Sequence, residues 1–301
     1  MNKPGLRFRA VDILLLIGML LPLVAGMVLK ILTNVPGEGI SISGARVYFE
    51  IGLPLGGLPI TESQVNSALV IVFVFFLCLY LTHGMKECPG CRRQLLAEWL
   101  VEKSEDLVRN NMGERFVGFS PFIGTILAIS ACSSLLTLVG LYAPTSDMNI
   151  VAGWAILVFI LITYYKCKGG VGLYLKGFFD PIPVFAPFNV IGEFATPISM
   201  AFRHYGNIMS GAVISVLVAA GLQGLSSMLF GWLPGFLGEI PFLQVGLPAI
   251  LSIYFDVFSG CLQAYIFAML TMLYISNGFP IEEYEARRER KAARKMKKQK
   301  N

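Results

Sequence analysis

Long apolar segments recur along this 301-residue chain, and they constrain its fold more than any other feature. A transmembrane helix needs about 20 predominantly apolar residues. Runs of this kind are expected at about 11–32, 64–85, 121–142 and 150–165, and two longer apolar regions cover 185–222 and 242–276. Only 14% of the residues are charged, against about 25% in soluble domains. The sequence therefore predicts an all-α integral membrane protein with about six membrane helices.

The last two apolar regions are too long to cross a bilayer upright. At 1.5 Å per residue, each helix would reach roughly 50 Å or more, against a hydrocarbon core of about 30 Å. We therefore expect two long, steeply tilted C-terminal helices, with Pro197 and Pro248 as candidate kinks.

The segments between the apolar runs differ in charge. Residues 86–115 combine Lys, Arg and Glu with Leu and Trp at near-helical spacing, which predicts an amphipathic helix at the membrane interface. Lys and Arg are also frequent at the N-terminus, at 166–176 and in the tail, but rare at 33–62 and 143–149. Because cytoplasmic loops carry the excess of Lys and Arg, this alternation predicts that both termini are cytoplasmic.

Polar residues form a stripe on each of the two long C-terminal helices. On the first helix, the stripe falls within an arc of roughly 120°. Its members are Glu193, Thr196, Ser199, Arg203, Asn207 and Ser210. On the second helix, the corresponding residues are Ser252, Asp256, Ser259 and Gln263. The two stripes can face each other across a polar seam inside the membrane.

Arg203 is the most costly residue of this seam to insert. An arginine near the centre of a span costs about 2.5–3.5 kcal/mol on insertion scales, and its guanidinium stays charged. Small polar residues such as Ser199 and Ser210 often only hold membrane helices together, but that role does not explain an arginine. Asp256 and Glu193 are weaker indicators, because a buried carboxylic acid can remain protonated. The seam predicts passage of ions across the bilayer.

Several segments resemble the a subunit of F-type ATP synthases. Residues 197–207, PISMAFRHYGN, are similar to that family's P-x-S-L-x-x-R-L-F-G-N signature. Residues 262–271, LQAYIFAMLT, resemble its L-Q-A-[YF]-I-F-x-x-L-T motif, and PTSDMN at 144–149 resembles its P-T-A-D-x-N turn. The amphipathic segment also lies where the family has a cytoplasmic helix. The resemblance extends in order from about residue 60 to residue 278.

This resemblance implies a stator subunit beside a rotating ring of c subunits, with two half-channels that conduct protons or sodium ions to the carboxylates of the ring. It implies that Arg203 attracts each ring carboxylate and blocks leakage between the half-channels, with Gln263 and Asn207 close by. It also implies a b-type peripheral stalk and the soluble ATPase sector as partners, a place in the bacterial plasma membrane, and no catalytic residue, cofactor or metal in this chain. The expected parts are an anchor helix and extracytoplasmic loop (1–62), an ion-translocating domain (63–280) and a basic tail (281–301).

The chain departs from the family pattern at four positions near the seam. His204 and Tyr205 replace the usual Leu and Phe, Ala212 stands where relatives often have Glu or His, and Asp256 where they have His or Glu. In relatives the last two positions are assigned to the non-cytoplasmic half-channel, so we expect Asp256 to serve alone or with water. His204 can titrate near neutral pH and is kept, with Ser199, as a possible participant. As the neighbour of Arg203, it is expected to point to another helix face.

Three other functions agree with parts of the pattern. A secondary ion-coupled transporter also places charge in a polar seam, but such folds usually have repeated halves, and no repeat is visible here. A redox or metal enzyme would use Cys88 and Cys91, yet no second pair or nearby histidine completes a metal shell. A structural scaffold has no need of Arg203. The basic stretch at 287–300 predicts contact with anionic lipid rather than nucleic acid.

Overall fold

The computed structural model of the protein describes residues 10–33, 44–53, 56–85, 92–180, 182–230 and 246–289. Within these ranges, six helical spans are long and apolar enough to cross a membrane. They are Val11–Leu32, Glu62–Thr82, Glu114–Val139, Met148–Cys167, Pro183–Leu229 and Ile253–Gly278. The predicted integral membrane fold with six helical spans is confirmed.

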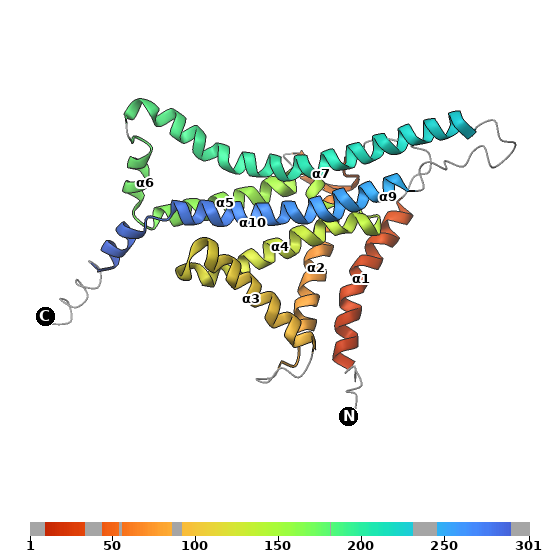
Figure 1. Ribbon diagram of the computed structural model, residues 1–301, viewed down its shortest axis with the longest axis horizontal. Helices are drawn as coiled ribbons and strands as arrows, with labels where there is room; N and C mark the ends of the chain where they lie inside the picture. Colours follow the sequence, from red (N-terminus) through yellow and green to blue (C-terminus); the bar gives the residue numbers. More distant parts are fainter. Residues whose placement is uncertain are drawn as a thin grey trace.

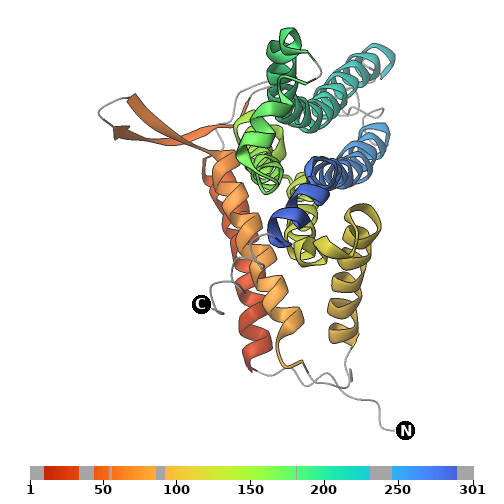
Figure 2. The same ribbon diagram turned by 90° about the vertical axis from the view of Figure 1, so that its left-hand side faces the viewer.

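The first two spans form a closely packed pair, α1 (Ala10–Leu32) and α2 (Glu62–Thr82). Gly18 of α1 allows this approach, because a Cβ atom there would lie 2.7 Å from the ring of Phe76. At Gly26 a Cβ atom would again meet a side chain of α2 at 2.7 Å. In Figures 1 and 2 the pair stands crosswise to the remaining long helices.

A two-stranded ribbon connects these two helices, and the sequence analysis did not predict it. Strands β1 (Val47–Leu53) and β2 (Gly56–Thr61) pair antiparallel, with Phe49 opposite Ile60. The strands are short and rich in Gly and Pro, so their alternation of apolar and polar residues is visible over only a few positions. Figure 2 shows the ribbon projecting sideways from the end of the α1–α2 pair.

The predicted amphipathic segment forms helix α3 (Arg92–Met112). Val108 is fully buried against the other helices, whereas Trp99 is half exposed. Arg93 ties α3 to α1 through a 2.7 Å ion pair with Asp12. The next elements are η1 (Glu114–Phe119), α4 (Ser120–Leu135), η2 (Leu136–Val139), η3 (Pro144–Ser146), α5 (Met148–Cys167), α6 (Val171–Gly177) and η4 (Pro183–Phe185).

Two long C-terminal elements complete the fold. Helix α7 (Ala186–Phe230) has 45 residues, or about 68 Å, and it bows along its length in Figure 1. It continues through Pro197 as a helix. Its partner consists of α9 (Leu247–Ser252), a π-helical segment η6 (Ile253–Ser259) and α10 (Gly260–Gly278). The departure from α-helical geometry therefore falls in η6, after Pro248.

The main hydrophobic core lies where α3, α4, α5, α7 and α10 meet. Its most buried members include Val108, Ile123, Val158, Met200, Phe267, Met272 and Ile275. This core fixes the inner faces of α7 and α10, and Figure 1 shows the long helices lying alongside one another. In an apolar 18-residue stretch of the Pro183–Leu229 span only 6% of the residues are buried, against 44% in the corresponding stretch of Ile253–Gly278. Most of α7 is therefore uncovered in the single chain.

Candidate functional site

The polar stripes of the two C-terminal elements meet at Asn207 and Ser259. Asn207 Nδ2 donates to Ser259 Oγ at 2.8 Å, and Ser259 Oγ donates to Asn207 Oδ1 at 3.1 Å. One turn further along α7, a Cβ atom on Gly211 would lie 2.9 Å from the ring of Phe255. Residue 207 thus faces 259, and residue 211 faces 255. The two elements run antiparallel in this region, with contacts that step by one helical turn.

The same register, continued one turn in the other direction, brings Arg203 level with Gln263. Gln263 is buried between the helices, whereas Arg203 is exposed on α7. The structure therefore supports the predicted seam, with the amide inside the bundle and the guanidinium toward its surface.

Arg203 is exposed on α7, and apolar side chains flank it. Its neighbours Ile198 and Phe202 are both more than half exposed. Within the described parts of the chain, the Arg203 guanidinium has no hydrogen-bond or ion-pair partner. A fixed cation at membrane depth without a counter-charge is costly, and a carboxylate supplied by another chain would remove that cost.

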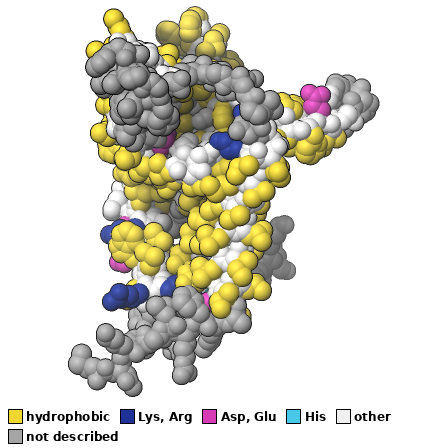
Figure 3. Space-filling model, turned by 90° about the vertical axis from the view of Figure 1, so that its right-hand side faces the viewer, with side chains coloured by type: hydrophobic (Ala, Val, Ile, Leu, Met, Phe, Trp, Pro, Cys, Tyr) yellow, Lys and Arg dark blue, Asp and Glu magenta, His cyan; other side chains and the backbone are white. Residues whose placement is uncertain are grey.

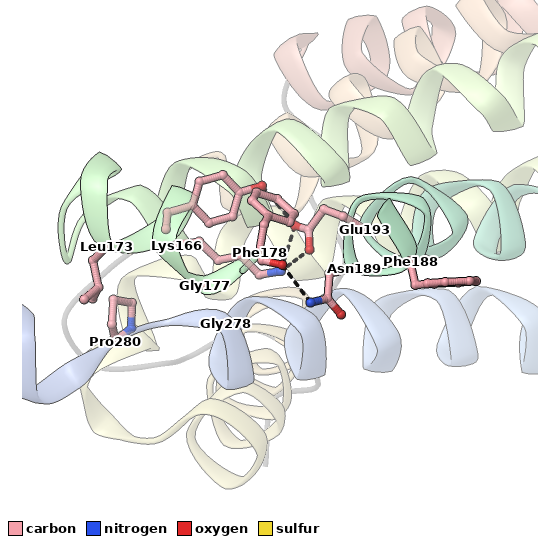
Figure 4. A pocket seen from close by; sticks show the side chains of 11 residues that line it. Lys166, Leu173, Gly177, Phe178, Phe188, Asn189, Glu193, Gly278 and Pro280 are labelled. Carbon is pink, nitrogen blue, oxygen red and sulfur yellow. Dashed lines mark hydrogen bonds and ion pairs between the residues drawn. The ribbon is translucent and has the colours of Figure 1, made fainter. Parts of the chain in front are cut away.

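Glu193 lies in a separate group, ten residues before Arg203 on α7. Lys166 Nζ of α5 donates to both Glu193 carboxylate oxygens at 2.7 Å, and Tyr174 Oη of α6 donates to one of them at 3.3 Å. These residues line a cavity of 440 Å³ together with Asn189 (Figure 4). Burial, and then the charge of Glu193, raise the pKa of Tyr174, so its hydroxyl remains a donor.

Asp256 and Ser199 occupy different environments on the two stripes. Asp256 is half buried in the π-helical segment η6, a type of turn that is frequent at functional sites. The antiparallel register brings it level with Ser210, which is exposed and donates to the Asn207 carbonyl at 3.0 Å. Ser199 is exposed on α7, one turn from Arg203.

His204 points into the bundle instead of toward the exposed face that carries Arg203. Its ring is fully buried, and Nε2 lies 3.4 Å from Ser130 Oγ of α4. The ring makes edge contacts with Trp154 and Phe267, at centroid distances of 6.1 and 5.6 Å. Among the described residues, its Nδ1 atom has no partner.

Serines on α4 form a third polar stripe that the sequence analysis missed. Ser130, Ser133 and Ser134 are all buried. Their spacing of three and four is the same signal that identified the other two stripes. Together with His204 they give the bundle a polar interior behind the seam.

The PTSDMN turn ties α2 to the start of α5. Asp147 accepts a hydrogen bond from Asn149 N at 2.9 Å, which caps α5, and it also accepts one from Ser63 Oγ of α2. Nearby, Asn66 Nδ2 donates to the Tyr142 carbonyl at 2.9 Å. Asp147 therefore has a positional role at the end of the bundle that carries the ribbon.

No group of three or more potential metal ligands occurs among the described residues. The Cys88–Cys91 pair lies outside these residues. The same holds for most of the basic tail.

The profile of the family described as ATP synthase A chain matches residues 65–276. ATP synthase subunit a of Legionella pneumophila (strain Philadelphia 1) is 28% identical over 237 residues, which cover 78% of this chain and 94% of the relative. ATP synthase subunit a 1 of Crocosphaera subtropica is 31% identical over 229 residues, which cover 73% of this chain and 90% of the relative. ATP synthase subunit a, sodium ion specific, of Propionigenium modestum is 28% identical over 276 residues, which cover 81% of this chain and 88% of the relative. Helix α1 and the β1–β2 ribbon lie outside the family match.

Proposed function

Since this chain belongs to the ATP synthase A chain family and serves ion-coupled ATP synthesis as the stator a subunit, we propose that Arg203 is the fixed cation of its translocation site. The chain is a multi-pass membrane subunit of an ATP synthase complex. This membership replaces the secondary-transporter alternative. We propose that the uncovered face of α7 meets a ring of c subunits, whose carboxylates arrive at Arg203 one at a time.

The chemistry of this step follows from electrostatics. Two unit charges 4 Å apart attract by about 4 kcal/mol at an effective dielectric constant of 20. Because one pKa unit corresponds to about 1.36 kcal/mol, a carboxylate facing Arg203 would have its pKa lowered by about three units. The carboxylate therefore releases its ion at Arg203 and takes one up again when it leaves. The same fixed charge repels ions that would otherwise pass directly along the seam.

The remaining site residues divide between the two half-channels. Glu193 lines the cavity with Lys166, next to the Lys-rich segment 166–176, so we assign it to the cytoplasmic half-channel. Asp256 is assigned to the opposite half-channel, because it lies on the far side of Arg203 along the seam. Gln263 and Asn207 position the two helices, and Ser199 and His204 have supporting roles.

The proposal extends to the topology, the membrane and the partners of the chain. Both termini are placed in the cytoplasm of a bacterium, with the protein in the plasma membrane and residues 63–280 as the translocating domain. A b-type stalk and the soluble ATPase sector are the further partners.

The observation that carries this proposal is that Arg203, exposed on α7, has no ion-pair partner among the residues that the structure describes. The test is Arg203→Ala in the intact complex, reconstituted into vesicles and assayed for ATP synthesis driven by an ion gradient. We expect synthesis to be lost while the complex remains assembled. Thr125→Ala is a suitable control, because Thr125 is exposed on α4 and its hydroxyl donates to the Pro121 carbonyl of the same helix at 2.7 Å. Normal synthesis with Arg203→Ala would refute the assignment.

A further inference from the structure

The base of the β1–β2 ribbon is fixed to the ends of two membrane spans. The Arg46 carbonyl accepts a hydrogen bond from Glu62 N, where α2 begins, at 2.7 Å. Arg46 Nη1 donates to the carbonyl of Thr33, just after α1, at 3.4 Å. With 23 and 21 residues, α1 and α2 are about 35 and 32 Å long, close to the hydrocarbon thickness of about 30 Å. The base of the ribbon therefore lies at a boundary between hydrocarbon and lipid headgroups.

The direction of the ribbon keeps it at this boundary. Figure 2 shows that it extends sideways, across the direction of α1 and α2 and away from α7 and α10. Seven residues of β1 reach about 24 Å. The ribbon thus runs along the membrane surface over much of its length instead of rising into water.

The two faces of the ribbon differ in polarity. Residues paired across an antiparallel ribbon share one face, so Phe49 and Ile60 lie on the same face as Ile51 and Leu58. On this apolar face Phe49, Ile51 and Leu58 are 56%, 43% and 50% exposed.

The opposite face carries Glu50, paired with Pro59, and the pair Gly52 and Gly57. Figure 3 shows an acidic side chain on the edge of the ribbon that is turned away from the spans. A ribbon with one apolar and one polar face is suited to an interface between lipid and water.

We propose that the β1–β2 ribbon is a lipid anchor, with its apolar face in the acyl boundary of one leaflet and Glu50 in water. Lipid is the occupant because the base of the ribbon is fixed to the ends of two membrane spans, and Ile31 and Leu32 at the end of α1 are among the most exposed apolar residues. Arg46 is exposed at the base of the ribbon, at the level of the lipid phosphates. The site takes phospholipid and does not depend on the assignment of Arg203.

The test compares adjacent residues on opposite faces in the intact complex. The six native cysteines are replaced by serine, and a nitroxide is attached to Ile51→Cys or to Glu50→Cys. The complexes are reconstituted into vesicles of phosphatidylcholine and phosphatidylglycerol. Power-saturation spectroscopy then compares collisions with oxygen, which concentrates in hydrocarbon, and with a water-soluble nickel chelate.

We expect oxygen to dominate at position 51 and the nickel chelate to dominate at position 50, so that the depth parameter changes sign between neighbours. Leu58→Cys and Pro59→Cys repeat the comparison on β2. Access of the nickel chelate to both faces would place the ribbon in water. Protection of position 51 from both reagents would mean that a protein covers this face. Either of these two results overturns the lipid anchor.

Discussion

Substitution of Gly260 by alanine tests the packing that supports the seam. Gly260 is buried at the start of α10, next to the Ser259 side chain that bonds to Asn207. A Cβ atom at Gly260 would lie 2.5 Å from Cβ of Ser134 on α4. Optimal carbon contacts are about 3.5–4.0 Å, so the two helices would have to separate by roughly 1 Å. The Ser134 Cβ is attached to its backbone, and rotation of the side chain does not relieve this contact.

Overpacking of this kind costs about 1–3 kcal/mol, and we expect Gly260→Ala to lower the free energy of unfolding by that amount. Steric trapping of the chain in bicelles measures this quantity, and the pumping rate of the assembled complex shows the effect on the seam. Gly153→Ala is the matched control, because nothing lies within 4 Å of a Cβ atom at Gly153. It should leave stability unchanged or raise it by about 0.5–1 kcal/mol through the better helix propensity of alanine.

The second control restores the space. Ser134→Gly in the Gly260→Ala background removes the contacting Cβ atom and should recover most of the lost stability. If Gly260→Ala is as stable as the wild type, or if Ser134→Gly fails to recover the loss, then α4 and α10 do not pack as described.

Three further substitutions test individual site residues. Lys166→Met leaves the Glu193 carboxylate, only 15% exposed, without its cation. We expect the free energy of unfolding to fall by about 1–3 kcal/mol, which is less than for a fully buried pair. A double-mutant cycle with Glu193→Gln should show strong coupling, and additive effects would contradict the ion pair. Asp256→Asn should slow ATP-driven ion pumping without abolishing it, and unchanged rates would remove Asp256 from the pathway. Arg203→Lys should abolish or nearly abolish ATP synthesis, because lysine lacks the planar guanidinium; near-normal synthesis would show that a point charge is sufficient.

The membrane spans could be predicted from the sequence because the bilayer sets their length. The segment expected at 11–32 forms a span with the same bounds, and the one expected at 64–85 forms α2, Glu62–Thr82. The ribbon could not be predicted in this way. Its strands are held by pairing with each other, and Phe49 pairs with Ile60 in a region whose Gly and Pro content suggested only a loop.

The candidate site was predictable only where it follows helical periodicity. Spacing by three and four brought Asn207 and Ser259 onto facing stripes, and their side chains are hydrogen-bonded. Lys166 entered the sequence analysis only as a topology signal, although it binds Glu193. Such a contact joins different helices through the α5–α6–α7 connection, so no local pattern within either helix contains it.

The π-helical segment η6 also defines a natural breakpoint for chimeric proteins. Its hydrogen bonds span five residues instead of four, so the rotational phase of the helix before it is offset from that of α10. None of the residues of η6 is buried, whereas α10 contributes eight buried residues to the bundle. Replacing residues 253–259 with the equivalent stretch of a relative would exchange the part of this element that contacts α7 at Asn207 and Gly211, and would leave the eight buried residues of α10 unaltered.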